Sequence, residues 1–319
     1  MKLGIGIILI AARAALAAEE MTIERLDPRI DALIPKDAKI KILADGYSWA
    51  EGPVWNPATA EILFSDVPNN VIHAWNGKEA TVFMKPSGYT GIANKGKESG
   101  SNGLTFDSDG RLISAEHGDR RVSLLTKNGE KVTLADRFDG KRLNSPNDVV
   151  VHSSGAVYFT DPIYGLPGGE GDPAREIDFC GVYRISNEGS VTLVTKELER
   201  PNGLAFSPDE KTLYVANSHG PRAIILSVAI NNDGGGGETK VFFDTKNLSG
   251  KGAPDGLKID TAGNLWATGP GGLLVISPDG KLLGRVLTGK PTANVAFGGK
   301  DGKTVFLTAS DSLASFPRL

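Results

Sequence analysis

The chain has 319 residues, including 40 glycines and one cysteine, and its formal net charge at pH 7 is −3. A weakly acidic chain without a basic run is not expected to bind nucleic acid, and Cys180 alone excludes a disulfide within the chain. The abundant glycine and the 23% of charged residues are typical of a turn-rich, all-β protein with a large core. We expect Cys180 to pack in that core.

The first 17 residues resemble a signal peptide. Lys2 provides a positive charge, an apolar stretch follows from Leu3 to Ile10, and Ala15-Leu16-Ala17 forms a small-x-small cleavage site. Arg13 interrupts the apolar residues, which argues against a membrane-spanning helix. The alternative is a frayed N-terminal helix. On the signal-peptide interpretation the protein is periplasmic or secreted.

Residues 18–37 are polar and poorly periodic, so we expect a leader over the surface of the domain. From residue 38 onward the chain repeats one design, in which a short strand opened by an acid or an amide leads through a turn to a second strand. Five openings lie at positions 51, 102, 147, 202 and 255, and a sixth, weaker copy opens at Ala293, followed by Asn294. Strand repeats with a period of roughly 40–50 residues are typical of a β-propeller, with one unit per blade. The sequence therefore predicts one propeller domain at 38–319.

Alternation of apolar and polar residues predicts four strands in each of the first five units. The strands lie at 51–55, 62–66, 71–75 and 81–84; at 102–106, 111–116, 121–126 and 131–136; at 147–151, 156–161, 181–185 and 191–195; at 202–206, 212–217, 223–230 and 239–243; and at 255–259, 264–268, 272–276 and 282–287. The sixth unit has only three, at 293–297, 304–308 and 312–316. We expect the N-terminal strand at 39–44 to complete this last blade, which closes the ring without an open edge.

Two long loops interrupt the repeats, a glycine-rich one at 87–100 and an insertion at 162–179 inside the third unit. Loops of this length in a compact domain are often functional.

The first strand of each propeller blade lines the central channel, and its start shares a face with the end of the second strand. The predicted inner ring is therefore Glu51, Asn102, Asn147, Asn202 and Asp255, and Asp66, Glu116, Asp161 and Asn217 lie just outside it. Any one of these side chains could simply cap a blade and bind water. Together, however, facing carboxylates without a cation would be costly, and an oxygen-only donor set suits Ca²⁺ better than a soft metal.

Four motifs also carry a resemblance to a known family: Glu51-Gly52-Pro53-Val54-Trp55, Ser145-Pro146-Asn147-Asp148-Val149, Arg200-Pro201-Asn202-Gly203-Leu204 and Ala253-Pro254-Asp255-Gly256-Leu257. They resemble the gluconolactonase family, which includes regucalcin and luciferin-regenerating enzyme. The resemblance runs from about residue 38 to the C-terminus. It implies a six-bladed propeller with one divalent cation at the channel mouth, usually Ca²⁺, with Zn²⁺, Mn²⁺ or Mg²⁺ as alternatives.

The resemblance also implies roles for individual residues. Glu51, Asn147, Asn202 and Asp255 match the metal ligands of the family, and Asn102 matches a residue that helps to hold the substrate. The segment 116–121 is similar to the bacterial gluconolactonase branch, so Glu116 joins Asn102 as a substrate-binding candidate.

The resulting hypothesis is a metal-dependent lactonase that hydrolyses a sugar lactone such as gluconolactone. The attacking water needs a general base, for which Asp255 is the first candidate and His117 and Asp161 are alternatives. The sequence has neither a serine in a nucleophile elbow nor a glycine-rich phosphate loop.

Two other interpretations stay open. The same metal could serve a promiscuous aryl-esterase or organophosphatase, or the propeller could be a non-catalytic ligand-binding module. The fold alone does not decide between them. The ring of ligands and the insertion at 162–179 favour catalysis on a small-molecule lactone, and the sequence makes no prediction of the oligomeric state.

Overall fold

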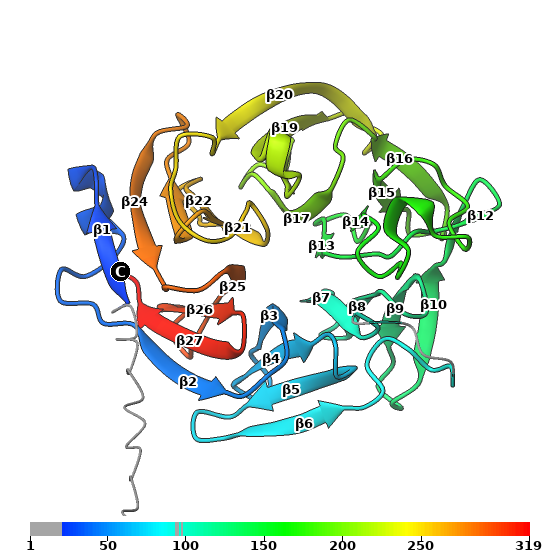
Figure 1. Ribbon diagram of the computed structural model, residues 1–319, viewed down its shortest axis with the longest axis horizontal. Helices are drawn as coiled ribbons and strands as arrows, with labels where there is room; N and C mark the ends of the chain where they lie inside the picture. Colours follow the sequence, from blue (N-terminus) through cyan, green and yellow to red (C-terminus); the bar gives the residue numbers. More distant parts are fainter. Residues whose placement is uncertain (1–20, 93–95, 97) are drawn as a thin grey trace, which may run out of the picture.

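The computed structural model describes residues 21–92, 96 and 98–319. The predicted signal peptide, 1–17, lies outside the described residues. In the part of the chain that the structure describes, six antiparallel sheets are arranged around a common axis (Figure 1). The predicted six-bladed propeller is confirmed.

In blades one to four the strands follow one another in chain order, blades five and six each also contain one early strand, and the strand bounds agree closely with those predicted. Blade one is β3 (Ala50–Asn56), β4 (Glu61–Asp66), β5 (Val71–Trp75) and β6 (Ala80–Met84); blade two is β7 (Ser101–Phe106), β8 (Leu112–Glu116), β9 (Arg121–Leu125) and β10 (Lys131–Ala135); blade three is β13 (Val149–Val151), β14 (Val157–Asp161), β15 (Gly181–Ile185) and β16 (Val191–Thr195). Blade four is β17 (Pro201–Phe206), β18 (Thr212–Asn217), β19 (Ile224–Ile230) and β20 (Gly236–Asp244); blade five contains β21 (Leu257–Ile259), β22 (Leu265–Gly269), β23 (Gly272–Ile276) and β24 (Leu282–Leu287); blade six contains β25 (Thr292–Gly298), β26 (Thr304–Ala309) and β27 (Ser312–Pro317).

The ring closes as predicted. Strand β2 (Lys41–Asp45) pairs antiparallel with β27, with Lys41 opposite Ser315 and Asp45 opposite Ser312. Blade six therefore contains both an early and the last strand of the described chain, which lie side by side in Figure 1. This pairing joins the two ends of the ring through backbone hydrogen bonds and covers the edge of β27.

Part of the segment predicted as a surface leader is built into the fold. Strand β1 (Thr22–Arg25) pairs with β24 as a fifth strand of blade five, and a 3₁₀ turn, η1 (Pro28–Ala32), follows it. Ile30 and Ile34 are fully buried, in one cluster with Trp266 and Leu283. A four-residue strand and a single helical turn are too short to produce a periodic pattern, which is why the sequence signal is weak here.

The core lies between neighbouring blades, where the apolar faces of adjacent sheets pack together. One cluster, for example, joins Phe159 and Tyr183 of blade three to Ile113 and Val122 of blade two. Cys180 is buried with Ile163 and Leu166, so the insertion at 162–179 packs onto blade three. Smaller described elements are β11 (Arg137–Phe138), β12 (Lys141–Arg142), η2 (Gly169–Gly171) and η3 (Gly220–Arg222). Among the described residues no helix has the length and apolar character needed to span a membrane.

Candidate active site

The five residues of the predicted inner ring come together around one cavity of about 150 Å³. They enter it from blades one to five, because each lies at or just before the first strand of its blade. The other lining residues are Trp49, Glu98, Tyr164 and Ser218. The structure thus brings Glu51, Asn102, Asn147, Asn202 and Asp255 into a single site from positions up to about two hundred residues apart in the sequence.

A backbone irregularity accompanies the ring residue in three of the blades. The pairing register shifts between Glu51 and Val54 and at the corresponding places in β7 and β17. A bulge of this kind bends a strand and redirects a side chain. Gly52 has a positive φ of 50°, and a Cβ there would lie 2.0 Å from the carbonyl oxygen of Asn102. Glycine after Glu51 therefore allows blades one and two to approach closely at the channel mouth.

The same close approach occurs between blades four and five. The backbone N–H of Gly203 donates to the carbonyl oxygen of Asp255 at 3.1 Å, and a Cβ on Gly203 would lie 2.3 Å from that oxygen. The glycine that follows Glu51 and Asn202 is thus a packing requirement around the channel.

Two buried carboxyl groups face this cavity. Glu51 Oε1 accepts a hydrogen bond from Trp49 Nε1 at 3.4 Å, and its Oε2 accepts one from the N–H of Gly52 at 3.1 Å. Burial raises the pKa of Glu51 to about 8, and the charges of Asp148 and Glu98 add to this. The pKa of Asp255 is also raised well above its usual value, first by burial and then by the charge of Glu51. Each carboxylate thus disfavours the ionised form of the other.

Besides the two carboxyl groups, the asparagine side chains of the ring direct amide oxygens toward a possible ligand. Asn202 Nδ2 donates to Ser218 Oγ at 2.9 Å, and Asn147 Nδ2 lies 3.4 Å from His117 Nε2. Because these amide nitrogens have protein partners, the amide oxygens are the atoms left for a ligand. Asn102 Oδ1 is a buried atom without a hydrogen-bond partner, and so is Asp255 Oδ1. Buried oxygens without a donor are costly unless a ligand completes their contacts.

These observations fit a hard divalent cation. The candidate ligands Glu51, Asn147, Asn202 and Asp255 are all oxygen donors, and a positive charge would relieve the repulsion between the two carboxylates. No group of three or more His, Cys, Asp or Glu side chains within the described ranges could hold a metal ion. That result is compatible with the ring, because two of its four candidate ligands are amides.

His117 lies behind the cavity and does not line it. The side chain is fully buried, and this burial lowers its pKa to about 4, so it is neutral at pH 7. Its Nδ1 lies 3.5 Å from Glu98 Oε2, and its Nε2 faces Asn147. A neutral imidazole between a pocket carboxylate and a ring amide is placed to orient both side chains.

Asp161 and Glu116 are not among the residues that line the cavity. Asp161 accepts hydrogen bonds from the backbone N–H groups of Asn144 at 2.7 Å and Ser145 at 2.8 Å. Its carboxylate thereby fixes the chain just before Asn147. Its burial raises its pKa to about 7.

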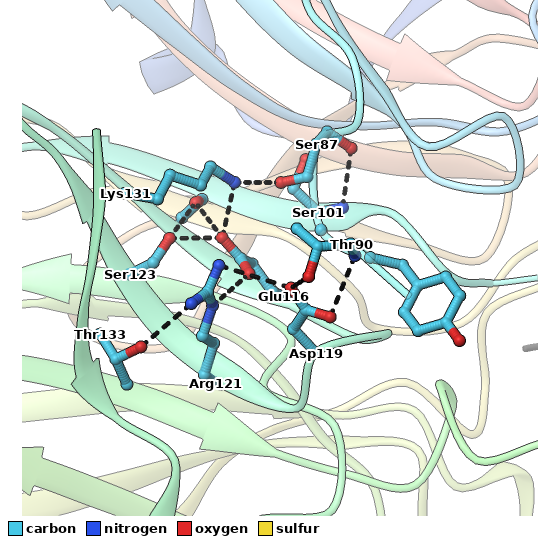
Figure 2. A network of polar contacts seen from close by, with 12 residues as sticks. Ser87, Thr90, Ser101, Glu116, Asp119, Arg121, Ser123, Lys131 and Thr133 are labelled. Atoms are coloured by element: carbon cyan, nitrogen blue, oxygen red, sulfur yellow. Dashed lines mark hydrogen bonds and ion pairs between the residues drawn. The ribbon is translucent and has the colours of Figure 1, made fainter. Parts of the chain in front are cut away.

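The Glu116 carboxylate is fully buried in a network of polar contacts (Figure 2). It accepts from Arg121 Nε at 2.7 Å, from Lys131 Nζ at 2.6 Å and from the hydroxyl of Ser123. With its lone pairs used in this way, Glu116 stabilises blade two beneath the cavity.

Four lining residues were not predicted from the sequence: Trp49, Glu98, Tyr164 and Ser218. Glu98 belongs to the glycine-rich loop at 87–100 and Tyr164 to the insertion at 162–179, whose length favours a functional role, but loop length does not tell which side chain points inward. The Tyr164 hydroxyl interacts with Ser218, and burial raises its pKa, so that it stays protonated as a hydrogen-bond donor. Ser218 directly follows the outer-ring residue Asn217.

Comparison with known proteins agrees with this geometry. The sequence model described as SMP-30/Gluconolactonase/LRE-like region matches residues 49–311. The chain is 38% identical over 306 residues to a gluconolactonase of Zymomonas mobilis, covering 91% of this chain and 84% of the relative. A solved gluconolactonase from Xanthomonas campestris is similar with a TM-score of 0.81 at 31% identity, covering 93% of this chain and 95% of that one. A calcium-binding regucalcin from Agrobacterium tumefaciens shares the fold, with a TM-score of 0.69 at 21% identity over 87% of this chain and 93% of that one.

Proposed function

The chain belongs to the SMP-30/gluconolactonase/LRE-like family, and from this premise we propose that it is a hydrolase that opens a sugar lactone such as gluconolactone with one divalent cation. The observation that carries the proposal is the ring of oxygen donors from five blades around one small cavity. Relatives that cover most of this chain are gluconolactonases, which supports a lactone-hydrolysing enzyme.

We propose Ca²⁺ as the cation, held by Glu51, Asn147, Asn202 and Asp255. The support is the oxygen-only donor set, the mutual repulsion of Glu51 and Asp255, and a relative of the same fold described as calcium-binding. When bound, such an ion acts as a Lewis acid that stabilises negative charge developing on a carbonyl oxygen.

The side chains of the site then have distinct tasks. Water adds to the carbonyl carbon of the lactone, the ring C–O bond breaks, and the product is an open-chain hydroxy acid. Asp255 accepts the proton of the attacking water, and the ring oxygen takes up a proton as it leaves. Asp255 Oδ1 is buried at the cavity and has no hydrogen-bond partner, so it is available to accept this proton. Asn102 and the protonated hydroxyl of Tyr164 line the cavity and hold the substrate.

The test is the rate of ring opening across a panel of lactones, each with Ca²⁺, Mg²⁺, Mn²⁺, Zn²⁺ or a chelator. We expect δ-gluconolactone to open well above its spontaneous rate with Ca²⁺ and to lose this acceleration with chelator. Asp255→Ala should lower kcat by roughly 10²-fold or more, the usual contribution of a general base. The matched control is Asp301→Ala, an exposed carboxylate in the turn before β26.

A spontaneous rate for every lactone in the presence of each metal would contradict the lactonase proposal. Hydrolysis of 4-nitrophenyl acetate without lactone opening would favour the aryl-esterase interpretation instead.

A further inference from the structure

Glu98 is a third carboxylate at the cavity, contributed by the loop between blades one and two. Its side chain is 41% exposed. It is set apart from the ring because it comes from a loop and not from the start of a blade. Glu98 nevertheless affects the ring, because its charge contributes to the raised pKa of both Glu51 and Asp255.

The described ends of this loop are held by the blades. Asn70 Oδ1 accepts from the N–H groups of Ser87 at 2.9 Å and Gly88 at 2.8 Å. Asp119 accepts from Thr90 N at 3.1 Å and Thr90 Oγ1 at 2.9 Å. These bonds position the first end of the loop on blades one and two.

The second end is fixed next to Glu98. The N–H of Gly100 donates to the carbonyl oxygen of Val67 at 2.8 Å, and the N–H of Ser101 donates to Ser87 Oγ at 3.0 Å. Lys131 Nζ donates both to the carbonyl oxygen of Ser87 and to Glu116, so the buried Glu116 network continues into the base of the loop (Figure 2). The second end of the loop is therefore anchored two residues after Glu98.

The buried imidazole of His117 lies next to the Glu98 side chain. Its Nε2 lies 3.4 Å from the amide nitrogen of Asn147, which can only donate. Nδ1 therefore carries the proton, and it lies 3.5 Å from Glu98 Oε2. Nδ1 is buried and forms no hydrogen bond of good geometry, and both the side chain and the backbone of Glu98 lie close to it. Glu98 Oε2 thus lies beside the imidazole, and the Glu98 side chain also lines the cavity, where its carboxyl oxygens can meet a ligand.

We propose that Glu98 determines substrate specificity by accepting hydrogen bonds from hydroxyl groups of a polyhydroxylated lactone. This inference rests on the proposed function and names the part of the substrate that the site selects. A carboxylate makes short, strong bonds to hydroxyl donors. A substrate without those hydroxyls would lack these bonds, so the site would favour a polyhydroxylated lactone over such an analogue.

The experiment compares δ-gluconolactone with δ-valerolactone, which has the same ring without hydroxyl groups. In Glu98→Gln and Glu98→Ala we expect kcat/KM for δ-gluconolactone to fall by roughly 10- to 100-fold, mainly through KM, as for loss of a hydrogen bond to a charged group. For δ-valerolactone kcat/KM should change by less than about threefold, because that substrate makes no such bond. Glu79→Gln, an exposed carboxylate in the turn before β6, is the matched control.

A parallel loss for both lactones would overturn the proposal and assign Glu98 to the chemical step. Unchanged kcat/KM values for both lactones in the Glu98 variants would overturn the proposal as well. If the wild type opens neither lactone, the proposed function has failed, and the binding of D-gluconate by calorimetry then tests Glu98 separately. Binding that is weakened about tenfold or more in Glu98→Gln, and not in Glu79→Gln, supports recognition of hydroxyl groups, whereas equal binding contradicts it.

Discussion

At the scale of single residues, the site combines buried polar groups, each of which costs folding free energy. Glu51 and Asp255 are carboxyl groups whose ionised forms are penalised by burial and by one another. Asn102 Oδ1 and Asp255 Oδ1 lack hydrogen-bond donors. Proteins keep such arrangements where function requires them, because each costs folding free energy.

The raised pKa of Glu51 predicts that the metal-free protein becomes less stable as pH rises. Between the ordinary pKa of 4.5 and the folded value of about 8, the folded state keeps a proton that the unfolded state has released. The free energy of unfolding therefore falls as pH rises through this range. His117 has the opposite effect between its folded pKa of about 4 and the ordinary 6.5, because there the unfolded state binds the extra proton. Above pH 6.5 the imidazole effect fades, and the effect of the carboxyl groups predominates up to pH 8, with Asp161 and Glu98, whose pKa values burial raises to about 7, adding to that of Glu51.

The measurement is urea denaturation with chelator at several pH values from 6.5 to 8, and Glu51→Gln serves as the comparison. We expect stability to decline across this range in the wild type and to decline less in the variant. A flat profile in the wild type would contradict the raised pKa.

At the scale of elements, a side-chain network and a short N-terminal segment both support the propeller. The buried Glu116 network joins blade two to the base of the loop that carries Glu98. The N-terminal segment of β1 and η1 closes the outer side of blade five and buries Ile30 and Ile34. The network and the N-terminal segment both stabilise parts of the molecule that lie outside the repeated four-strand unit.

Ile30→Ala tests the contribution of η1. Removal of a fully buried isoleucine side chain leaves a cavity beside Trp266 and Leu283, and we expect a loss of roughly 2–5 kcal/mol in the free energy of unfolding. Leu26→Ala is the control, because Leu26 is half exposed and its loss should cost no more than about 0.5 kcal/mol. Chemical denaturation measures both. Equal effects would mean that the segment packs only loosely on the propeller.

At the scale of the whole molecule, the proposed ligands connect parts of the chain that are distant in sequence. Glu51, Asn147, Asn202 and Asp255 come from blades one, three, four and five. A cation bound to all four would join these blades at the channel mouth, where β2 and β27 already close the ring through blade six. Metal binding and the stability of the propeller should therefore be coupled.

We expect Ca²⁺ at a hundredfold excess over its Kd to raise the free energy of unfolding by about 2.7 kcal/mol, the amount that mass action gives for one site. Calorimetric thermal unfolding with Ca²⁺ and with chelator measures this shift. Asp255→Asn should remove most of it, and the exposed Asp301→Asn should leave it unchanged. An equal shift in Asp255→Asn would place calcium elsewhere on the protein.

Much of this molecule is determined locally, and for that reason the sequence alone predicts it. Each blade repeats the same strand and turn signals, so the period establishes the number of blades, and the position of Glu51 or Asn202 at the start of a first strand establishes the inner ring. The bulges and the glycines after these residues then turn the side chains into one cavity.

The remaining features depend on contacts between distant segments, and only the tertiary structure decides them. Glu98 and Tyr164 belong to loops without periodicity, so nothing in their neighbourhood shows that they face the cavity. The environments of Glu116 and His117 come from packing, since burial and partners from other strands decide whether a polar side chain faces a substrate or supports a blade. Sequence patterns record which residues repeat, whereas burial and charge coupling arise only when the blades have assembled.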